Sequence, residues 1–331
     1  MSEPASNSLG EAIDMHVHIV GNGLGGSGCW LKVGAAHRPL AAFMLRHIGV
    51  PEGLKSERFD AAYVERLLEL VGGSSLSSAV ILAHEEVYDM SGRQMGEAGA
   101  MYVPNDYVLR LAREHREFLP AVSIHPARLD AMDELERCLE AGAVMMKCLP
   151  NCQNIDCSDE RLRPFWSRMA AAGLPLLAHT GGEHTLPVIS PQYADPRTFR
   201  LPLECGVKVI AAHCATKSGL TDPEYIEAFF QMLKEHPNLF GDTSAFNVPL
   251  RGRHARRCLQ PEIASRLVHG SDFPVPVYGH WAFLWRTISW RDYRRVQAIP
   301  NVLERDYQLK RAMGFGPEHF TRIGSLLRKR V

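Results

Sequence analysis

The stretch Ala12-Ile13-Asp14-Met15-His16-Val17-His18-Ile19 is a short apolar run with a polar side chain at every second inner position. Alternate side chains of a β-strand point to one face, so Asp14, His16 and His18 share one side. Same-face neighbours stand ~6.6 Å apart, and two imidazoles that lean together can bind one ion through bonds of ~2.0 Å. The alternative, two hydrogen-bonded histidines near a strand end, requires a partner for each buried ring nitrogen. The stretch therefore predicts a strand that carries a metal-binding histidine pair.

Seven further apolar runs of strand length follow, separated by turns and by segments with helical periodicity. The eight predicted strands span residues 12–19, 78–84, 119–124, 143–149, 175–179, 207–213, 239–243 and 266–271. The intervening helical segments include 61–70, 106–117, 130–140, 159–172 and 223–235. This alternation indicates a parallel α/β fold, but periodicity alone does not separate an open doubly wound sheet from a closed barrel.

The polar residues at the strand ends favour the barrel. The fifth predicted strand ends at His179, the sixth ends at His213, and the eighth leads into Asp272. In a parallel barrel all such ends open onto one face, where active sites are assembled. Neutral imidazoles with one carboxylate suit zinc and leave a position for water. We therefore predict an α/β fold of the (β/α)8 TIM-barrel type, distorted, with loop insertions and a C-terminal helical extension.

The length of 331 residues suits one large domain, because α/β barrels often exceed 250 residues as a single unit. We predict one barrel domain over residues 1–331, with the barrel core at about 12–277 and a helical segment at about 278–331. A glycine-rich insertion at 21–53 contains a G-x-G-x-x-G match, but no helical pattern follows promptly and no acidic residue ends a second strand. A mobile active-site loop is the preferred interpretation, and no organic cofactor is predicted.

Composition restricts the classes of partner. Lys plus Arg and Asp plus Glu number 37 each, which leaves no global field to attract nucleic acid or an anionic membrane. No stretch approaches the ~20 apolar residues that cross a bilayer, and residues 1–12 lack a signal-peptide pattern. Eight cysteines without regular spacing fit a reducing compartment. We expect a cytoplasmic protein that acts on a small molecule, with no nucleic-acid or membrane partner and a homodimer as the candidate assembly.

Taken together, the motifs resemble the amidohydrolase superfamily, in particular its amidohydrolase-2 branch, from Asp14 to about Val277. The matching elements are Asp-Met-His-Val-His at 14–18, Lys147, His179, His213 and Gly-Ser-Asp-Phe-Pro at 270–274. The resemblance implies that His16, His18 and His179 bind a divalent metal, zinc by preference and manganese as the alternative. It also implies that Asp272 contacts the metal and accepts a proton from the attacking water. His213 would hold that water, polarise the substrate or join the metal ligands.

Lys147 has three interpretations. The segment at 146–151 resembles that of dihydroorotases, in which this lysine forms a carbamate that bridges two metals. A plain amine would orient an anionic substrate or pair with Asp272. The third interpretation is a surface lysine, although the residue ends a very apolar run. One metal ion is the preferred prediction, and two are expected if Lys147 is carboxylated.

The predicted function is hydrolysis of a small ester, lactone or amide by a metal-activated water, with Asp272 as the general base. The alternative is a non-oxidative decarboxylase of a carboxylated aromatic or muconate-like compound, because the resemblance extends to aminocarboxymuconate semialdehyde decarboxylase. Arg251 and Arg253 would hold a substrate carboxylate in either reaction, unless they belong to a solvated basic loop. His84, which ends the second predicted strand, is a further candidate for contact with the substrate.

Overall fold

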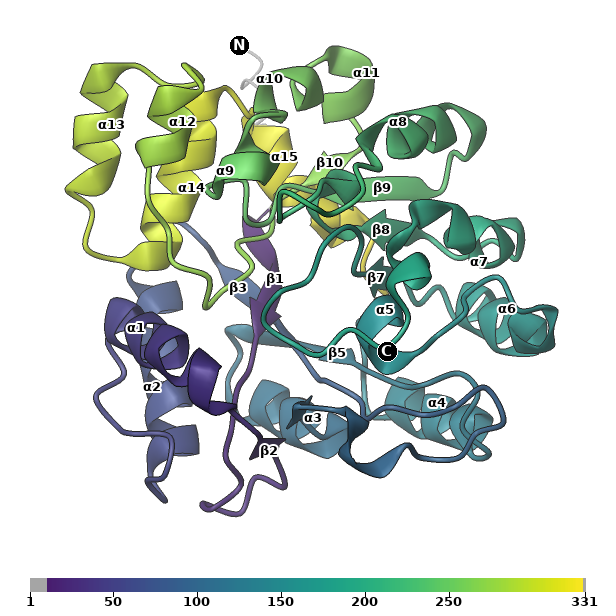
Figure 1. The fold of residues 1–331 in the computed structure, drawn as a ribbon. Coiled ribbons are helices and arrows are strands. Elements are labelled where there is room, and N and C mark those ends of the chain that lie inside the picture. Colours follow the sequence, from purple (N-terminus) through teal and green to yellow (C-terminus); the bar gives the residue numbers. More distant parts are fainter. Residues whose placement is uncertain (1–10, 330–331) are drawn as a thin grey trace, which may run out of the picture.

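The computed structural model describes residues 11–329; residues 1–10 and 330–331 lie outside the described part, so the prediction about a targeting segment at 1–12 falls largely outside it. The described chain forms one sheet of eight parallel strands surrounded by helices (Figure 1). In the order of their hydrogen bonding, the strands are β1 (Ile13–His18), β3 (Ser78–Leu82), β5 (Phe118–Val122), β6 (Met145–Cys148), β7 (Leu176–Ala178), β8 (Val209–Ala211), β9 (Leu239–Asp242) and β10 (Leu267–Val268).

The first strand also pairs with the segment at the end of the last one. Met15 N donates a hydrogen bond to His269 O at 3.2 Å. His18 N donates to Phe273 O at 2.9 Å, next to a parallel bridge between Val17 and Phe273. These contacts nearly close the sheet into a ring, which confirms the predicted TIM barrel and excludes the open doubly wound sheet.

The strands form where the sequence predicted apolar runs, because both faces of each strand are buried. All five residues of β3 are buried, as expected when helices cover the outside of a parallel sheet. Outside lie α2 (Phe59–Gly72), α3 (Asn105–Glu114), α4 (Ala131–Glu140), α6 (Arg163–Ala171), α7 (Arg200–Glu204), α8 (Ile226–Glu235), α10 (Ala255–Cys258) and α11 (Pro261–Ala264). The segments that follow β6 and β9 contain the short helices α5 (Pro150–Gln153) and α9 (Pro249–Gly252).

Two features of the structure differ from the predictions. The insertion at 21–53 is not a loop throughout, because it contains α1 (Arg38–Ile48), which has a proline in its first turn and ends at Gly49 in the left-handed region. It also contains β2 (Trp30–Leu31), which pairs with β4 (Met101–Tyr102). The predicted strand 207–213 stops at Ala211, since His213 has a φ of 57° that no strand residue adopts.

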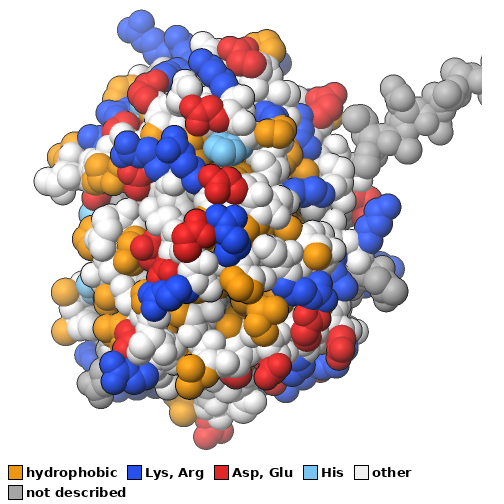
Figure 2. Space-filling model, turned by 90° about the vertical axis from the view of Figure 1, so that its right-hand side faces the viewer, with side chains coloured by type: hydrophobic (Ala, Val, Ile, Leu, Met, Phe, Trp, Pro, Cys, Tyr) orange, Lys and Arg blue, Asp and Glu red, His pale blue; other side chains and the backbone are white. Residues whose placement is uncertain are grey.

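The C-terminal part is helical, with α12 (His280–Leu284), α13 (Trp290–Gln297), α14 (Val302–Met313) and α15 (Pro317–Thr321). The side chain of Asn301 caps α14 by accepting bonds from Leu303 N and Glu304 N. In the view of Figure 1, α12, α13 and α14 lie above α1 and α2 at the left edge of the barrel. Across residues 11–329, the helices are all too short or too polar to cross a membrane. Basic and acidic side chains alternate over the face in Figure 2.

Candidate metal centre

Strand β1 brings His16 and His18 together at the carboxyl end of the barrel. Their Nε2 atoms lie 3.2 Å apart, and the pairing of β1 with β3 is irregular between Asp14 and Val17. Asp272, in the loop after β10, adds a carboxylate oxygen. Its Oδ1 lies 3.2 Å from the Nε2 of His16 and 3.3 Å from that of His18.

The spacing of these three atoms fits a metal ion. Ligands at ~2.0 Å from a tetrahedral ion are separated by about 3.3 Å, close to the three distances observed. His16, His18 and Asp272 are the group that the described residues offer with all ligand atoms within 4.8 Å of one another. A divalent metal is therefore the ligand that this donor set suits best.

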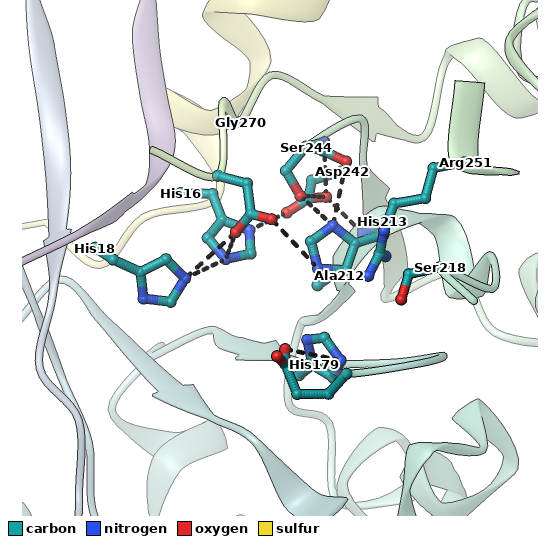
Figure 3. A network of polar contacts seen from close by, with 12 residues as sticks. His16, His18, His179, Ala212, His213, Ser218, Asp242, Ser244, Arg251 and Gly270 are labelled. Carbon is teal, nitrogen blue, oxygen red and sulfur yellow. Dashed lines mark hydrogen bonds and ion pairs between the residues drawn. The ribbon is translucent and has the colours of Figure 1, made fainter. Parts of the chain in front are cut away.

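His179, directly after β7, and His213, two residues after β8, face the same space but lie outside that triangle (Figure 3). The buried Nε2 of His179 has no hydrogen-bond partner among residues 11–329 and is 3.9 Å from Glu183 Oε2. The ring of His213 lies 5.2 Å from that of His179, and its Nε2 is 4.0 Å from Asp272 Oδ2. The structure thus brings the predicted histidines around one space, and it leaves the buried nitrogen of His179 free to bind a ligand.

The protonation states of these groups suit a ligand role. Burial and the charge of Lys147 lower the pKa of His16 to about 4, and burial lowers that of His179 to about 3. Burial opposes ionisation of Asp272, but the nearby rings of His213 and His16 hold its pKa well below the usual range. At neutral pH the rings of His16 and His179 are neutral and the carboxylate of Asp272 is charged, as metal ligands must be.

Asp242, at the end of β9, is a site residue that the sequence analysis missed. Its Oδ2 lies 2.7 Å from His16 Nδ1, and its Oδ1 accepts hydrogen bonds from His213 N at 2.7 Å and Ser244 N at 3.0 Å. A carboxylate on Nδ1 fixes the proton there, so Nε2 of His16 carries the lone pair. The signal was present in the sequence, because Asp242 ends a buried strand as the predicted ligands do.

Asp14 lies behind the donors and joins the first strand of the barrel to the segment that follows the last strand. Its Oδ1 accepts hydrogen bonds from His16 N at 3.1 Å and from Ser271 N at 2.9 Å. Burial raises its pKa to about 7. Asp14 thus links β1, which carries the histidine pair, to the loop that carries Asp272.

Lys147 is buried in the barrel, so its interpretation as a surface lysine is wrong. Its Nζ donates to His16 Nε2 at 3.1 Å, and no carboxylate of the described chain lies within the 4.0 Å of an ion pair. Burial lowers the pKa of Lys147 despite the attraction of Asp272 and Asp242. A lysine with a lowered pKa is more readily neutral, which is the form that reacts to give a carbamate.

The two candidate arginines point in different directions. Arg251 is 5% exposed and lines the cavity beside the donors, where its Nη2 donates to Gly182 O at 3.1 Å. Its Nη1 has no hydrogen-bond partner in the described part of the chain. Arg253 instead donates to Glu224 at 2.6 Å and to His254 at 2.9 Å. It does not line the cavity, so the structure does not support its assignment as a substrate residue. Arg251 lies on α9, whereas Arg253 follows the end of this helix.

His84 is buried, and its backbone pairs with that of Val103. Burial lowers its pKa to about 3, and its ring is not part of the lining of the cavity. His84 therefore lies below the surface that a substrate would contact.

The cavity above the donors has a volume of about 580 Å³. His18, His179, His213, Asp272 and Arg251 form one end of its lining, and Glu183 and Ser218 add polar groups. Cavities of this size hold small organic ligands. The site therefore combines ligand atoms for a metal, a buried cation and room for a substrate.

A (β/α)8 barrel with histidines and a carboxylate gathered at the carboxyl ends of its strands belongs to the class of metal-dependent TIM-barrel enzymes. The sequence profile of the amidohydrolase family matches residues 13–295, and the chain belongs to this family. The superfamily expected from the motifs is thereby confirmed.

Several solved structures are similar to this one. An uncharacterised TIM-barrel protein from Bordetella bronchiseptica has 17% identity and a TM-score of 0.57, over 92% of this chain and 99% of that one. IDCase from Metarhizium anisopliae, in its apo form, has 12% identity and a TM-score of 0.49, over 98% of this chain and 100% of that one. Amidohydrolase 2 from Bifidobacterium longum subsp. infantis has 14% identity and a TM-score of 0.45, over 93% of this chain and 100% of that one. No curated protein matches the chain. At these identities the first of these structures supports the fold alone.

Proposed function

We propose that the protein is a metal-dependent hydrolase of a small ester, lactone or amide. The observation that carries the proposal is the triangle of His16 Nε2, His18 Nε2 and Asp272 Oδ1, with sides of 3.2 to 3.3 Å. One zinc ion is the preferred occupant, with manganese as the alternative. A bound divalent ion would lower the pKa of water towards neutrality and polarise a substrate carbonyl.

The residues of the chain then have separate tasks. Asp242 keeps the proton of His16 on Nδ1 and leaves Nε2 as a donor atom. Asp272, ionised at neutral pH, accepts the proton of the attacking water. The Nδ1 of His213 lies 3.1 Å from the carbonyl oxygen of Ser244, which places its proton on Nδ1. Its Nε2 is then an acceptor, so His213 is suited to hold the water rather than to polarise a carbonyl.

A decarboxylase is the second candidate, and Arg251 is the observation in its favour. Its buried guanidinium has an unpartnered nitrogen beside the donors, where it can hold a substrate carboxylate. In this reaction the carboxylate leaves as carbon dioxide, whereas in hydrolysis it only anchors the substrate. Product analysis distinguishes the two, because only one of them releases carbon dioxide.

Metal content tests the proposal directly. We would purify the protein without chelator and measure metals per chain by elemental mass spectrometry, together with the Asp272→Asn and Lys147→Ala variants. About one ion per chain, unchanged in Lys147→Ala, is expected for a mononuclear site. Two ions that fall to one or none in Lys147→Ala would indicate a carbamate-bridged pair. A protein that binds no metal even after reconstitution would rule the proposal out.

The proposal extends to the location and the partners of the protein. All eight cysteines are free thiols, which supports a reducing compartment such as the cytoplasm. The mixed charges of the surface in Figure 2 support a small-molecule substrate rather than nucleic acid or membrane. A homodimer remains the assembly that we expect, and sedimentation in solution would measure it.

A further inference from the structure

Helix α1 lines the cavity and is only partly buried. Ile48, its last residue, is the one residue of this helix that is buried. The cavity is lined by Leu40, Ala41, Met44 and Leu45 on one side of the helix. An amphipathic helix normally buries its apolar side against the core, whereas this one turns it towards an open space.

The walls opposite α1 are also apolar. Leu31, Val33 and Leu54 face the same space, while the exposed Lys32 and His37 add polar groups to its lining. Leu31, Val33, Leu45 and Leu54 also border a second cavity of about 840 Å³. We call the apolar part of the first cavity, lined by Leu31, Val33, Leu40, Met44, Leu45 and Leu54, the α1 chamber.

The α1 chamber is continuous with the candidate metal centre. A single cavity of about 580 Å³ has His18, His179, His213 and Asp272 in its lining together with the residues of the α1 chamber. A molecule that holds its reacting group at the donors can therefore extend under α1 without leaving the cavity. A substrate of only a few atoms would leave most of this apolar surface in contact with water, at a free-energy cost that grows with the exposed area.

Arg251 provides a charge at the end of the cavity where the donors lie. Figure 3 shows its guanidinium beside His213 and Ser218. Across residues 11–329 its guanidinium forms no ion pair within 4.0 Å, and its Nη1 is buried without a hydrogen-bond partner. A buried guanidinium stays charged and is costly unless an anion pairs with it. The part of the cavity that Arg251 lines suits a carboxylate of the ligand.

We infer that the substrate is an amphipathic carboxylate. Its carboxylate pairs with Arg251 beside the reacting bond, and an apolar chain or ring system fills the α1 chamber. This inference rests on the proposed function and extends it by naming the class of substrate. Arg251 and the α1 chamber then select for different parts of one molecule, so their contributions to binding can be measured separately.

Binding of simple carboxylates to the zinc-loaded protein tests the inference by titration calorimetry. Decanoate is the probe, with butanoate as its short analogue and decan-1-ol as its uncharged analogue. We expect decanoate to bind at least ~10-fold more tightly than butanoate, because the added methylenes leave water for the chamber. We also expect it to bind at least ~10-fold more tightly than decan-1-ol. Equal affinities for decanoate and butanoate would overturn the assignment of the chamber.

Matched variants separate the two ends of the ligand. Arg251→Met should weaken decanoate at least ~10-fold and leave decan-1-ol unchanged, whereas Arg253→Met should alter neither. Met44→Glu should weaken decanoate at least ~10-fold, whereas Phe43→Glu, on the neighbouring exposed residue outside the lining, should not. Arg251→Lys, which keeps the charge, should retain part of the preference for decanoate over decan-1-ol. A preference that survives Arg251→Met would overturn the carboxylate site.

Two controls separate this inference from the proposed function. Metal content and circular dichroism of each variant show whether the centre and the fold are intact. The titrations are repeated on chelator-treated protein, where Arg251-dependent binding should persist without the ion. Metal binding without Arg251-dependent binding of decanoate refutes the inference alone. Arg251-dependent binding in a protein that never takes up metal refutes the proposed function alone.

Discussion

The barrel contains two buried clusters of histidine, aspartate and lysine, and only one of them has the properties of an active site. We call the first the open cluster, formed by His16, His18, His179, His213, Asp242, Asp272 and Lys147. The second, the closed cluster, lies behind β10 and comprises His269, His319, Asp306 and Lys310, each at most 3% exposed. Residue types alone do not distinguish them.

The lysines show the difference most clearly. In the closed cluster Lys310 Nζ lies 2.5 Å from Asp306 Oδ2 and donates to Gly270 O at 2.6 Å. In the open cluster Lys147 has no ion-pair partner among the described residues and donates only to His16. One cluster pairs its lysine with an aspartate, whereas the other places His18, His179, His213 and Asp272 in the lining of a cavity.

A buried cluster therefore indicates a functional site when its unpaired polar atoms belong to residues that line a cavity. The closed cluster also has unpartnered atoms, including both ring nitrogens of His269, but none of its residues lines either of the two cavities described above. Its ion pair holds Gly270, two residues before Asp272, and so supports the loop that carries the proposed general base. We thus expect substitutions in the open cluster to affect activity and those in the closed cluster to affect stability.

The largest effect is expected for Asp272→Asn. Removal of a general base typically lowers the rate by ~10²- to 10⁴-fold, and the amide also weakens metal binding. The kcat of the variant would be measured on the ester or lactone that the native enzyme turns over best. Asp306→Asn in the closed cluster is the control and should lose less than about 5-fold, since it does not face the cavity. An equal loss in both variants would refute the division between the clusters.

The two lysines should differ in their effect on stability. Lys310→Met leaves Asp306 as an uncompensated buried charge and should lower the free energy of unfolding by about 3 to 5 kcal/mol. Lys147→Met breaks no ion pair and should cost less than about 1.5 kcal/mol, the value of one hydrogen bond. Urea unfolding of chelator-treated protein at pH 8 measures both.

A second substitution checks the cause of the Lys310 effect. Asp306→Asn in the Lys310→Met background should recover part of the lost stability, because it removes the unpaired charge. If the double variant is no more stable than Lys310→Met, the loss comes from packing or from the bond to Gly270. If Lys147→Met is the more destabilised of the two single variants, the comparison of the lysines is wrong.

Asp242→Asn should act on the metal centre without contacting the metal. Loss of the carboxylate frees His16 to change its orientation and tautomer, and such changes typically weaken metal affinity ~10- to 100-fold. Competition with a chromophoric chelator would measure the dissociation constant for zinc. The same measurement on Asp306→Asn should give the native value. An unchanged affinity in Asp242→Asn would show that β1 alone orients His16.

Much of the fold was predictable because each buried strand is an apolar run that a polar residue terminates. The same rule located His179, His213 and Asp272, since the carboxyl ends of parallel strands meet on one face. It could not exclude His269, which follows the same strand as Asp272 but faces the closed cluster. Whether a side chain after a strand turns towards the cavity depends on backbone angles such as the φ of 66° at Asp272.

Other parts of the site depend on contacts between segments far apart in the sequence. The sequence gives no reason to prefer Arg251 over Arg253 as a substrate residue. The two differ in the structure because Arg253 pairs with Glu224. Helix α1 was not predicted because the glycines before it suggested a loop. The burial of Lys147 was favoured by its apolar run, but its contact with His16 requires the closed barrel.

The last expected effect concerns the pH dependence of stability. Burial raises the pKa of Asp306 from 3.8 to about 6, although Lys310 opposes this, and the charge of Asp272 adds to it; the ring of His269 lies 4.0 Å away. Between pH 4 and 6 the folded protein therefore keeps a proton that the unfolded chain has released. The free energy of unfolding contributed by this group falls as the pH rises through that range, by at most about 1.4 kcal/mol per pH unit.

Urea unfolding of the native protein and of Asp306→Asn from pH 4 to 7 isolates this contribution. Asparagine cannot ionise, so the variant should gain stability relative to the native protein as the pH rises from 4 to 6, and the difference should then level off. A difference that does not change with pH would mean that Lys310 holds Asp306 ionised throughout. The closed cluster would then be a permanent ion pair, and its contrast with the unpaired Lys147 would be greater still.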